Sequence, residues 1–377
     1  MTRSPRVAIV HDYLSQRGGA ERVLLSILRA FPGADIFTSI YVKDATYPEF
    51  RDATIHTSWL NRVGPIRRNH RLALPFLAGI FSRLSVVADV AICSSSGWAH
   101  GARVQGLKVV YCYTPARWLY QPDKYLEFSN HRVAEWALRL MTPSLMRWDR
   151  QHALASDHYL TTSTAVQERI RRAYGIKAAI LPPPYSLDTE GPMTPIPGLA
   201  PGFFLCVSRL LDYKNLRAVL AASAGLPDGL RVVIVGDGPD RAYLTSMAST
   251  NVQIVGSISD AQLRWCYSNC VALIAAAYED FGLTPVEAAA FGKPAVALRW
   301  GGYLDTVTEG TTGLFFESPS ASAIREAMVR SLTIKFSQKA ILRKAASYTE
   351  AAFIEDLRNR VAQALDEHAP KHNAGRP

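Results

Sequence analysis

The sequence predicts an α/β protein of two domains, each built on a parallel β-sheet covered by helices. The chain has 377 residues, the length of two ordinary domains. Short runs rich in Val, Ile and Ala alternate with longer segments of helical period, which is the pattern of a helix-covered parallel sheet. Prolines and glycines crowd residues 183–202, where neither a helix nor a central strand can continue. We therefore predict one domain over residues 1–185 and another over residues 200–349.

Each half opens with a buried strand, a loop and a helix, as Rossmann-like domains do. The first half contains predicted strands at 6–10, 35–41, 87–93, 108–113 and 158–163. The second half contains them at 203–208, 231–236, 252–256, 271–277 and 294–298. Ligands of such sheets bind beyond the carboxyl ends of the strands. The amphipathic segment at about 350–367 is expected to form a helix that packs back on the first domain.

The composition favours a globular protein without a disulfide framework. The five cysteines lie mostly in apolar runs, where a thiol behaves as a small buried hydrophobe, and their spacing predicts no zinc site. No run of about 18 apolar residues and no signal-peptide pattern is present, which favours a cytoplasmic location.

Positive charge is concentrated in the first half of the chain. Residues 1–185 carry 24 Lys and Arg against 13 Asp and Glu, whereas residues 186–377 carry 18 against 19. Such asymmetry indicates an anionic partner: a nucleic acid, a membrane surface or a phosphorylated substrate.

The segment after the predicted strand 271–277 carries the most specific pattern. We expect Thr284 to cap the following helix, with Pro285 as its first residue. Glu287 then stands three residues after the cap, so a structural capping box is an alternative to a functional role. The helix start offers free backbone N–H groups and a positive dipole end, which suit a diphosphate.

Glu279 and Glu287 are separated by the seven residues DFGLTPV, and this segment resembles the Glu-x7-Glu motif of family-4 retaining glycosyltransferases. The resemblance implies a GT-B fold, in which two Rossmann-like domains face each other across a cleft. It also implies that Glu279 contacts the donor sugar and that Glu287 binds the donor ribose. The remaining implied donor residues are Phe281 and Gly282, which shape the loop, and Leu283 and Thr284, which offer backbone N–H groups to the phosphates.

Two cations follow the first strand of the second half, in SRLLDYKN. Arg209 and Lys214 occupy places where the family carries a similar Arg and Lys. Cations there would stabilise the negative charge of a departing diphosphate, although isolated surface cations are more often simply solvated. Because these cations are present and no Asp-x-Asp motif is seen, we expect neither a metal ion nor a cofactor.

The first half contains the candidates for the acceptor side. Gly18 and Gly19 resemble the family's N-terminal glycine loop and are assigned to donor binding, although a lone Gly-Gly is as often only a turn. Glu21 is expected to complement the helix dipole in the first turn. His11 and Asp12 end the first strand and form either a structural pair or acceptor contacts.

The segment YCYTPARW is similar to a family segment that reads Cys-His-Thr-Pro and then carries an Arg. Tyr113 stands where the family has the histidine, so Tyr113 and the nearby His100 are both acceptor-side candidates, together with Arg117. A lone histidine is more often structural. In the second half, Gly301 and Gly302 are expected near the donor, and residues 309–313 in a hairpin-like turn.

Residues 59–84 combine arginines with aromatic residues and contain no acidic residue. We predict that this segment lies on anionic lipid, although an ordinary core-facing helix with a solvated arginine face would show the same composition. The candidate membrane residues are Trp59, Arg67, Arg68, Arg71, Phe76 and Phe81. The protein is accordingly expected at the inner face of the cell membrane.

Taken with its resemblance, the chain is predicted to transfer a hexose from a nucleoside-diphosphate sugar to a glycolipid, lipid-linked or polysaccharide-precursor acceptor, with retention. HDY…RGGAERV and CYTPARW resemble bacterial mannosyltransferases of polysaccharide and glycolipid assembly, which favours GDP-mannose; a UDP-sugar is the alternative. A basic nucleic-acid-binding protein is a rival, but no RNA-recognition, zinc-finger or helix-turn-helix pattern supports it. A dinucleotide oxidoreductase would need G-x-G-x-x-G after an opening strand, and neither half has it.

Overall fold

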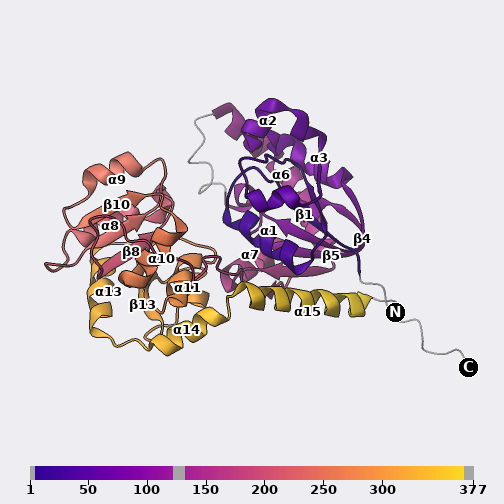
Figure 1. Ribbon diagram of the computed structural model, residues 1–377. Helices are drawn as coiled ribbons and strands as arrows, with labels where there is room; N and C mark the ends of the chain where they lie inside the picture. Colours follow the sequence, from indigo (N-terminus) through magenta and orange to yellow (C-terminus); the bar gives the residue numbers. More distant parts are fainter. Residues whose placement is uncertain (1–4, 122–131, 369–377) are drawn as a thin grey trace, which may run out of the picture. The chain divides into compact units, whose positions relative to one another are not determined.

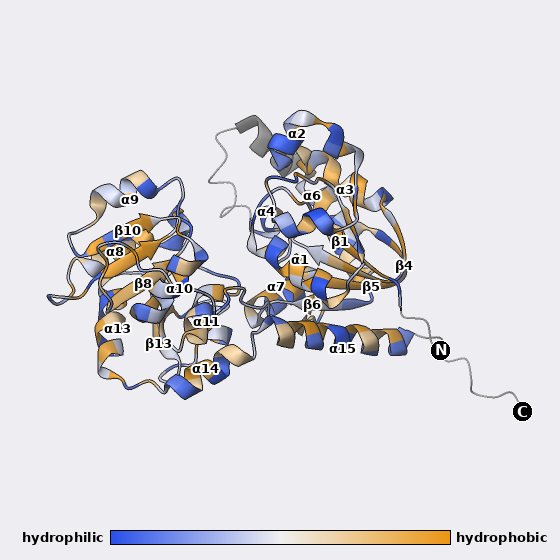
Figure 2. Ribbon diagram, in the orientation of Figure 1, coloured by the Kyte–Doolittle hydropathy of each residue, from blue (hydrophilic) through white to orange (hydrophobic). Residues whose placement is uncertain are grey.

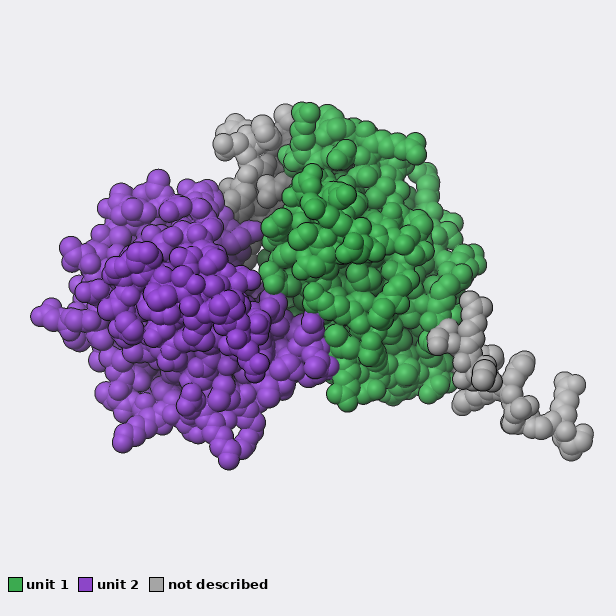
Figure 3. Space-filling model, viewed as in Figure 1, with its two compact units in different colours: residues 1–162, 166–183, 353–377 green, residues 163–165, 184–352 purple. Residues whose placement is uncertain are grey.

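The computed structural model describes residues 5–121 and 132–368, and the chain divides into two units (Figures 1 and 3). Unit 1 comprises Met1–Thr162, Val166–Pro183 and Phe353–Pro377, and unit 2 comprises Ser163–Ala165 and Pro184–Ala352. The chain passes from unit 1 to unit 2 at residue 184, next to residue 185, where the sequence predicts the end of the first domain. The return of the chain to unit 1 at residue 353 lies inside the C-terminal helix.

Unit 1 contains a seven-stranded parallel sheet of order β3-β2-β1-β4-β5-β6-β7. The strands are β1 (Val7–His11), β2 (Asp35–Thr38), β3 (Ile55–Thr57), β4 (Ser85–Ser95), β5 (Arg103–Cys112), β6 (His158–Thr161) and β7 (Ala179–Ile180). The strand order reverses between β1 and β4, which is the switch point of a Rossmann-like sheet. Strands β3 and β7 were not predicted, because three and two residues show no readable period.

Helices cover both faces of this sheet. They are α1 (Gly19–Ala30), α2 (Gly64–Arg68), α3 (Leu74–Arg83), α4 (Arg117–Tyr120), α6 (Arg132–Leu154), α7 (Thr164–Tyr174) and the last helix α15 (Glu350–His368). Short 3₁₀ helices are η1 (Pro48–Asp52), η2 (Trp59–Arg62), η3 (His70–Ala73) and η4 (Ala99–Gly101).

Helix α15 packs on unit 1 through one apolar face. Phe353, Leu357 and Val361 are buried in the cluster that also contains the inner face of α1. Arg358 donates to the carbonyl oxygen of Ala30 at 2.7 Å, which ties α15 to the end of α1. The alternation of hydrophobic and hydrophilic residues along α15 is visible in Figure 2.

Unit 2 repeats the arrangement with a six-stranded parallel sheet of order β10-β9-β8-β11-β12-β13. Its strands are β8 (Phe203–Val207), β9 (Val232–Val235), β10 (Val252–Gly256), β11 (Cys270–Ala275), β12 (Ala295–Leu298) and β13 (Gly313–Phe316). The switch point lies between β8 and β11. The helices are η6 (Asp212–Lys214), α8 (Leu216–Ser223), α9 (Arg241–Met247), α10 (Asp260–Asn269), α11 (Leu283–Ala290), α12 (Tyr303–Thr306), α13 (Ala321–Thr333) and α14 (Gln338–Ala346).

The turn expected at residues 309–313 is present, but it does not join the strands of a hairpin. The chain does turn there, with the N–H of Gly310 donating to the carbonyl oxygen of Gly313 at 2.8 Å. The turn leads, however, into β13, which pairs in parallel with β12. A tight hairpin joins only antiparallel strands.

The proline-rich segment 183–202 has no helix or strand, as its composition predicts, but three of its side chains pack on unit 2. Leu187, Ile196 and Leu199 are buried in the core of unit 2. Arg264 donates to the carbonyl oxygen of Pro192 at 2.8 Å. The segment is therefore a part of unit 2.

The cysteines are all buried as free thiols, as the apolar runs predict. Over the two described ranges, no helix is both long and apolar enough to cross a bilayer.

Candidate functional site

The candidate donor site lies in unit 2 at the carboxyl edge of the sheet, at the switch point between the neighbouring strands β8 and β11. Lys214 belongs to η6 after β8, and Glu279 lies in the loop after β11. Their side chains form an ion pair and are only 11% and 30% exposed. Asn215 adopts a left-handed conformation, with φ of 56°, and donates to the carbonyl oxygen of Ala276 at 2.8 Å. This contact holds η6 against the end of β11, so the structure brings two of the predicted catalytic residues together.

Arg209 is presented by a backbone segment that two glycines support. A Cβ at Gly236 would lie 1.9 Å from the carbonyl oxygen of Ser208, and a Cβ at Gly238 would lie 2.3 Å from that of Leu210. The glycines of the segment VGDGP, residues 235–239, therefore allow two backbone segments to touch, which the sequence could not reveal. Arg209 itself is exposed, and its guanidinium has no hydrogen-bond or ion-pair partner among residues 5–121 and 132–368.

Helix α11 begins at Leu283, two residues before the predicted first residue Pro285. Gly282 precedes the helix with a φ of 83°, and a Cβ there would lie 2.4 Å from the ring of Tyr303. Thr284 is therefore inside the helix, so its prediction as the cap is wrong and the alternative of a capping box with Glu287 is excluded. A glycine takes the left-handed conformation readily, and this conformation sets the helix start.

Glu287 is thus freed from a capping role, and one carboxylate oxygen accepts a hydrogen bond from the hydroxyl of Tyr267 at 2.7 Å. No side chain caps the start of α11. The backbone N–H groups of Leu283 and Thr284 therefore stand at an uncapped helix N-terminus, which is a favourable place for an anion.

The loop after β12 fixes the backbone of Glu279. The N–H of Gly302 donates to the carbonyl oxygen of Glu279 at 3.0 Å. A Cβ at Gly301 would lie 2.2 Å from this oxygen, and a Cβ at Gly302 would lie 2.2 Å from the Cα of Phe281. Phe281 is buried and packs against the ring of Tyr348. The two glycines expected near the donor thus position the donor loop.

In unit 1, the corresponding switch point carries a chain of hydrogen bonds. Nδ1 of His11 lies 3.0 Å from the hydroxyl of Ser94, which lies 2.9 Å from the hydroxyl of Tyr113. Tyr113 donates in turn to the carbonyl oxygen of Ala20 at 3.0 Å. Burial lowers the pKa of His11 to about 4 and raises the pKa of Tyr113. These groups join β1, β4 and β5 to the start of α1 as neutral partners.

Asp12 does not pair with His11. Its carboxylate accepts the backbone N–H groups of Ser96, Trp98 and Ala99 at 2.7, 3.2 and 2.6 Å. Burial raises the pKa of Asp12 to about 6 in spite of these donors. Asp12 therefore holds the loop after β4, so the expected structural pair with His11 is wrong.

His100 is enclosed in the core of unit 1. Nδ1 lies 3.1 Å from the hydroxyl of Ser95, and Nε2 lies 3.1 Å from a carboxylate oxygen of the buried Asp149. Only 2% of the His100 side chain is exposed, so both ring nitrogens face protein groups. Arg117, the other candidate near Tyr113, is exposed at the start of α4.

The glycine loop of unit 1 leads into α1. Gly18 precedes the helix, and a Cβ there would lie 2.5 Å from Oε2 of Glu21, which lies in the first turn as predicted. Burial raises the pKa of Glu21. A Cβ at Gly19 would meet no atom within 4 Å. A side chain at position 18 would therefore collide with Glu21, whereas the structure leaves room for one at position 19.

The candidate membrane residues divide between surface and core. Phe81 is fully buried, so its assignment as a membrane anchor is wrong: α3 turns this side chain, with Leu77, toward the core. Trp59 and Phe76 are 56% and 48% exposed, with ring centroids 6.1 Å apart. Arg67 and Arg68 are exposed at the end of α2, whereas the side chain of Arg71 lies outside the described part of the chain.

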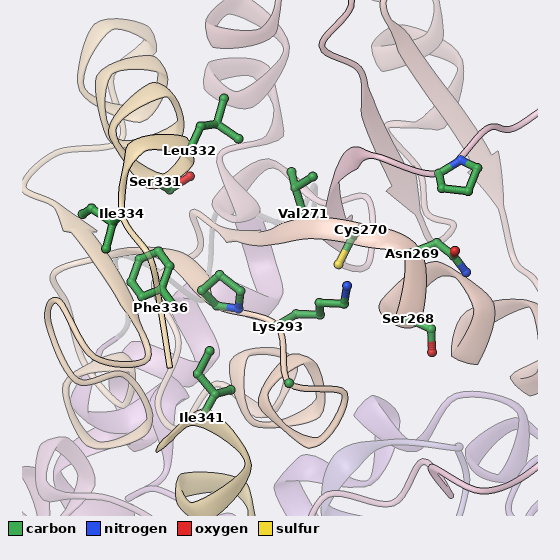
Figure 4. Close-up of a pocket in the computed structure, with 13 residues that line it drawn as sticks. Ser268, Asn269, Cys270, Val271, Lys293, Ser331, Leu332, Ile334, Phe336 and Ile341 are labelled. Carbon is green, nitrogen blue, oxygen red and sulfur yellow. The ribbon is translucent and has the colours of Figure 1, made fainter. Parts of the chain in front are cut away.

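A cavity of about 530 Å³ lies elsewhere in unit 2 (Figure 4). Lys293 and Asn269 line one part of it, and Phe336 and Ile341 line another. It touches the amino-terminal ends of β11 and β12, so it lies at the sheet edge opposite to Glu279 and is separate from the candidate donor site.

Comparison with known proteins agrees with this geometry. Residues 198–348, which lie in unit 2, match the family model "Glycosyl transferases group 1". The chain is 43% identical over 137 residues to the alpha-1,3/1,6-mannosyltransferase ALG2 of Dictyostelium discoideum, covering 29% of this chain and 33% of the relative. It is 32% identical over 112 residues to a GDP-mannose-dependent alpha-mannosyltransferase of Corynebacterium glutamicum, covering 29% and 26%.

A glycogen synthase of Pseudomonas fluorescens is 29% identical over 173 residues, covering 44% of this chain and 31% of the relative. The chain thus matches a third or less of the length of these relatives. Among solved structures, Anabaena Alr3699/HepE in complex with UDP superposes with a TM-score of 0.69 at 14% identity, covering 95% of this chain and all of that one. Together with the two parallel sheets, this likeness identifies the fold as GT-B, with two Rossmann-like domains.

Proposed function

We propose that the protein is a retaining glycosyltransferase that takes a hexose from a nucleoside-diphosphate sugar bound to unit 2. The observation that carries the proposal is the Lys214–Glu279 ion pair, which lies at the switch point within the segment that matches the glycosyltransferase model. The partly buried cation Lys214 and the uncapped N-terminus of α11, which starts four residues after Glu279, suit a diphosphate, and the carboxylate of Glu279 suits the hydroxyls of a sugar.

In this proposal each charged residue has one task. The N–H groups of Leu283 and Thr284 bind the diphosphate, and Glu287 binds the ribose. Glu279 accepts hydrogen bonds from the hexose. Lys214 and Arg209 stabilise the negative charge that develops on the diphosphate as the sugar–phosphate bond breaks, which lowers the barrier because this charge is largest in the transition state. These two cations perform this task without a metal ion.

We propose GDP-mannose as the donor. Two relatives named as mannosyltransferases support this choice, and one of them is named as GDP-mannose-dependent. The UDP complex of HepE favours a UDP-sugar as the second candidate. A screen of nucleotide sugars with mass analysis of the products decides between them. Transfer from none of the donors would contradict the proposed activity.

The acceptor is proposed to be a glycolipid, a lipid-linked sugar or a polysaccharide precursor that binds to unit 1 at an anionic membrane surface. Trp59 and Phe76 supply exposed apolar contact, and Arg67 and Arg68 supply charge beside them in the chain. Each arginine near anionic lipid contributes about 1 kcal/mol, so two of them change the partition coefficient roughly 30-fold. This placement corresponds to the inner face of the cell membrane.

The membrane proposal is tested by co-sedimentation with anionic and neutral vesicles at low and high salt. We expect wild type to bind only anionic vesicles and to be released by salt, because exposed charges are screened. Changing Arg67 and Arg68 to Glu should abolish binding. The matched control changes Arg171 and Arg172 to Glu, which alters the net charge equally on α7, where both arginines are exposed. Equal loss in both double variants would contradict a specific surface.

A further inference from the structure

Two aromatic residues stand immediately beside the candidate donor loop. Tyr278 directly precedes Glu279, and Trp300 directly precedes Gly301 and Gly302, the glycines that hold the backbone of Glu279. They come from the ends of neighbouring strands β11 and β12. Neither residue belongs to the pattern that pointed to the donor site.

The two rings form a fixed unit. Their centroids are 5.2 Å apart and their planes meet at 85°, which is the favourable edge-to-face arrangement. Trp300 packs in part against the core of unit 2, which restricts its motion. Tyr278 remains 40% exposed. A large aromatic ring that is held in place and open to solvent next to a polar site offers a surface for a ligand.

The charges around this pair favour a neutral ligand group over a phosphate. Arg299, the residue before Trp300, is ion-paired with Glu309 and Glu317, at 2.7 and 2.6 Å. Its guanidinium also lies over the ring of Phe315. Arg299 is thus held by two carboxylates of its own. The aromatic pair therefore borders the proposed sugar contact Glu279 from the β12 side, whereas Lys214 reaches Glu279 from the β8 side.

We propose that Tyr278, supported by Trp300, forms a stacking platform for the hexose of the donor. The inference rests on the proposed function and extends it. A hexopyranose carries hydroxyls at its edge and an apolar C–H face, so Glu279 accepts from the edge while the aromatic ring covers the face. The platform selects the sugar and contributes nothing to the nucleotide, because the proposed ribose contact Glu287 lies in the second turn of α11.

The experiment compares the affinities for nucleotide sugar and free nucleotide by titration calorimetry, with GDP-mannose against GDP and UDP-glucose against UDP. In Tyr278→Ser, we expect the affinity for the nucleotide sugar to fall about tenfold and that for the nucleotide to stay unchanged. Tyr278→Phe keeps the ring and should bind as wild type does. Tyr243→Ser is the matched control, since Tyr243 is 46% exposed on α9.

The outcomes separate the platform from the proposed function. If wild type binds a nucleotide sugar and Tyr278→Ser binds it equally well, the platform is wrong and the donor site stands. Equal weakening of nucleotide and nucleotide sugar also overturns the platform, because the ring then serves the nucleotide or the fold. If wild type binds none of the four compounds, the proposed function fails and the platform fails with it.

Discussion

Gly282, in the loop that joins β11 to α11, has no room for a side chain, and Gly282→Ala should destabilise unit 2 measurably. Two effects add. A left-handed residue with a Cβ costs about 1–2 kcal/mol, and φ at Gly282 is 83°. The new Cβ would also lie 2.4 Å from the buried ring of Tyr303, and overpacking of this kind costs about 1–3 kcal/mol. We expect a total loss of roughly 2–5 kcal/mol in the free energy of unfolding.

A second glycine separates the two effects. Gly310 has a φ of 71°, but a Cβ there would meet no atom within 4 Å. Gly310→Ala should therefore lose only the conformational part, about 1–2 kcal/mol. Urea unfolding of wild type and both variants, followed by far-UV circular dichroism, gives the comparison. Equal destabilisation of the two variants would refute the assignment of Tyr303 as the obstacle, and with it the reason given for the start of α11.

Two further predictions concern metal ions and pH. Transfer should proceed at the full rate in excess chelator, and inactivation that Mg²⁺ or Mn²⁺ reverses would contradict the metal-free role of Arg209 and Lys214. Burial lowers the pKa of His11 from 6.5 to about 4. Between these two pH values the unfolded chain binds a proton at His11 and the folded chain does not. The folded state therefore keeps its full stability above pH 6.5 and loses about 3 kcal/mol as the pH falls to 4. Relative to wild type, His11→Gln should thus gain about this amount between pH 6.5 and pH 4 in urea unfolding, and parallel pH curves would exclude a buried neutral His11.

Some parts of the fold could be predicted because one local pattern determines them. The four residues of β9 are all apolar and all buried, so a short apolar run between turns was sufficient to place the strand. The face of α15 that packs on unit 1 follows from its helical period in the same way. The short strands β3 and β7 depend on their neighbours in the sheet and leave no such pattern.

The errors arose where distant residues decide the conformation. The sequence around Thr284 satisfies the pattern of a capping box, but Gly282 and the ring of Tyr303, 21 residues further on, set the helix start. Phe81 lies in an aromatic and basic segment that suits a membrane surface. Its burial beside Gly101, whose added Cβ would lie 3.3 Å from the Cβ of Phe81, is visible only in the folded chain.

The site was predicted best where its residues belong to one motif. Glu279 and Glu287 are linked by a fixed spacing, whereas the contact between Lys214 and Glu279 joins residues that are 65 positions apart. The partners of His100 were equally out of reach, because Asp149 comes from α6. The sequence shows which charged and polar residues follow each strand. It does not show which of them contact each other, because these contacts depend on the order of the strands in the sheet.

The central claim is that Lys214 stabilises the departing diphosphate of a nucleotide sugar and that Glu287 binds its ribose. The most direct measurement is the turnover of GDP-mannose, or of the donor found by the screen, in Lys214→Ala and Glu287→Ala. Arg217→Ala is the control, because Arg217 lies only three residues from Lys214 but is 54% exposed on α8. Loss of one charge-stabilising contact typically lowers the rate about 10²–10³-fold, and we expect this loss in Lys214→Ala and a large loss in Glu287→Ala, with a near-normal rate in the control. Near-wild-type turnover in both folded site variants would contradict the donor site.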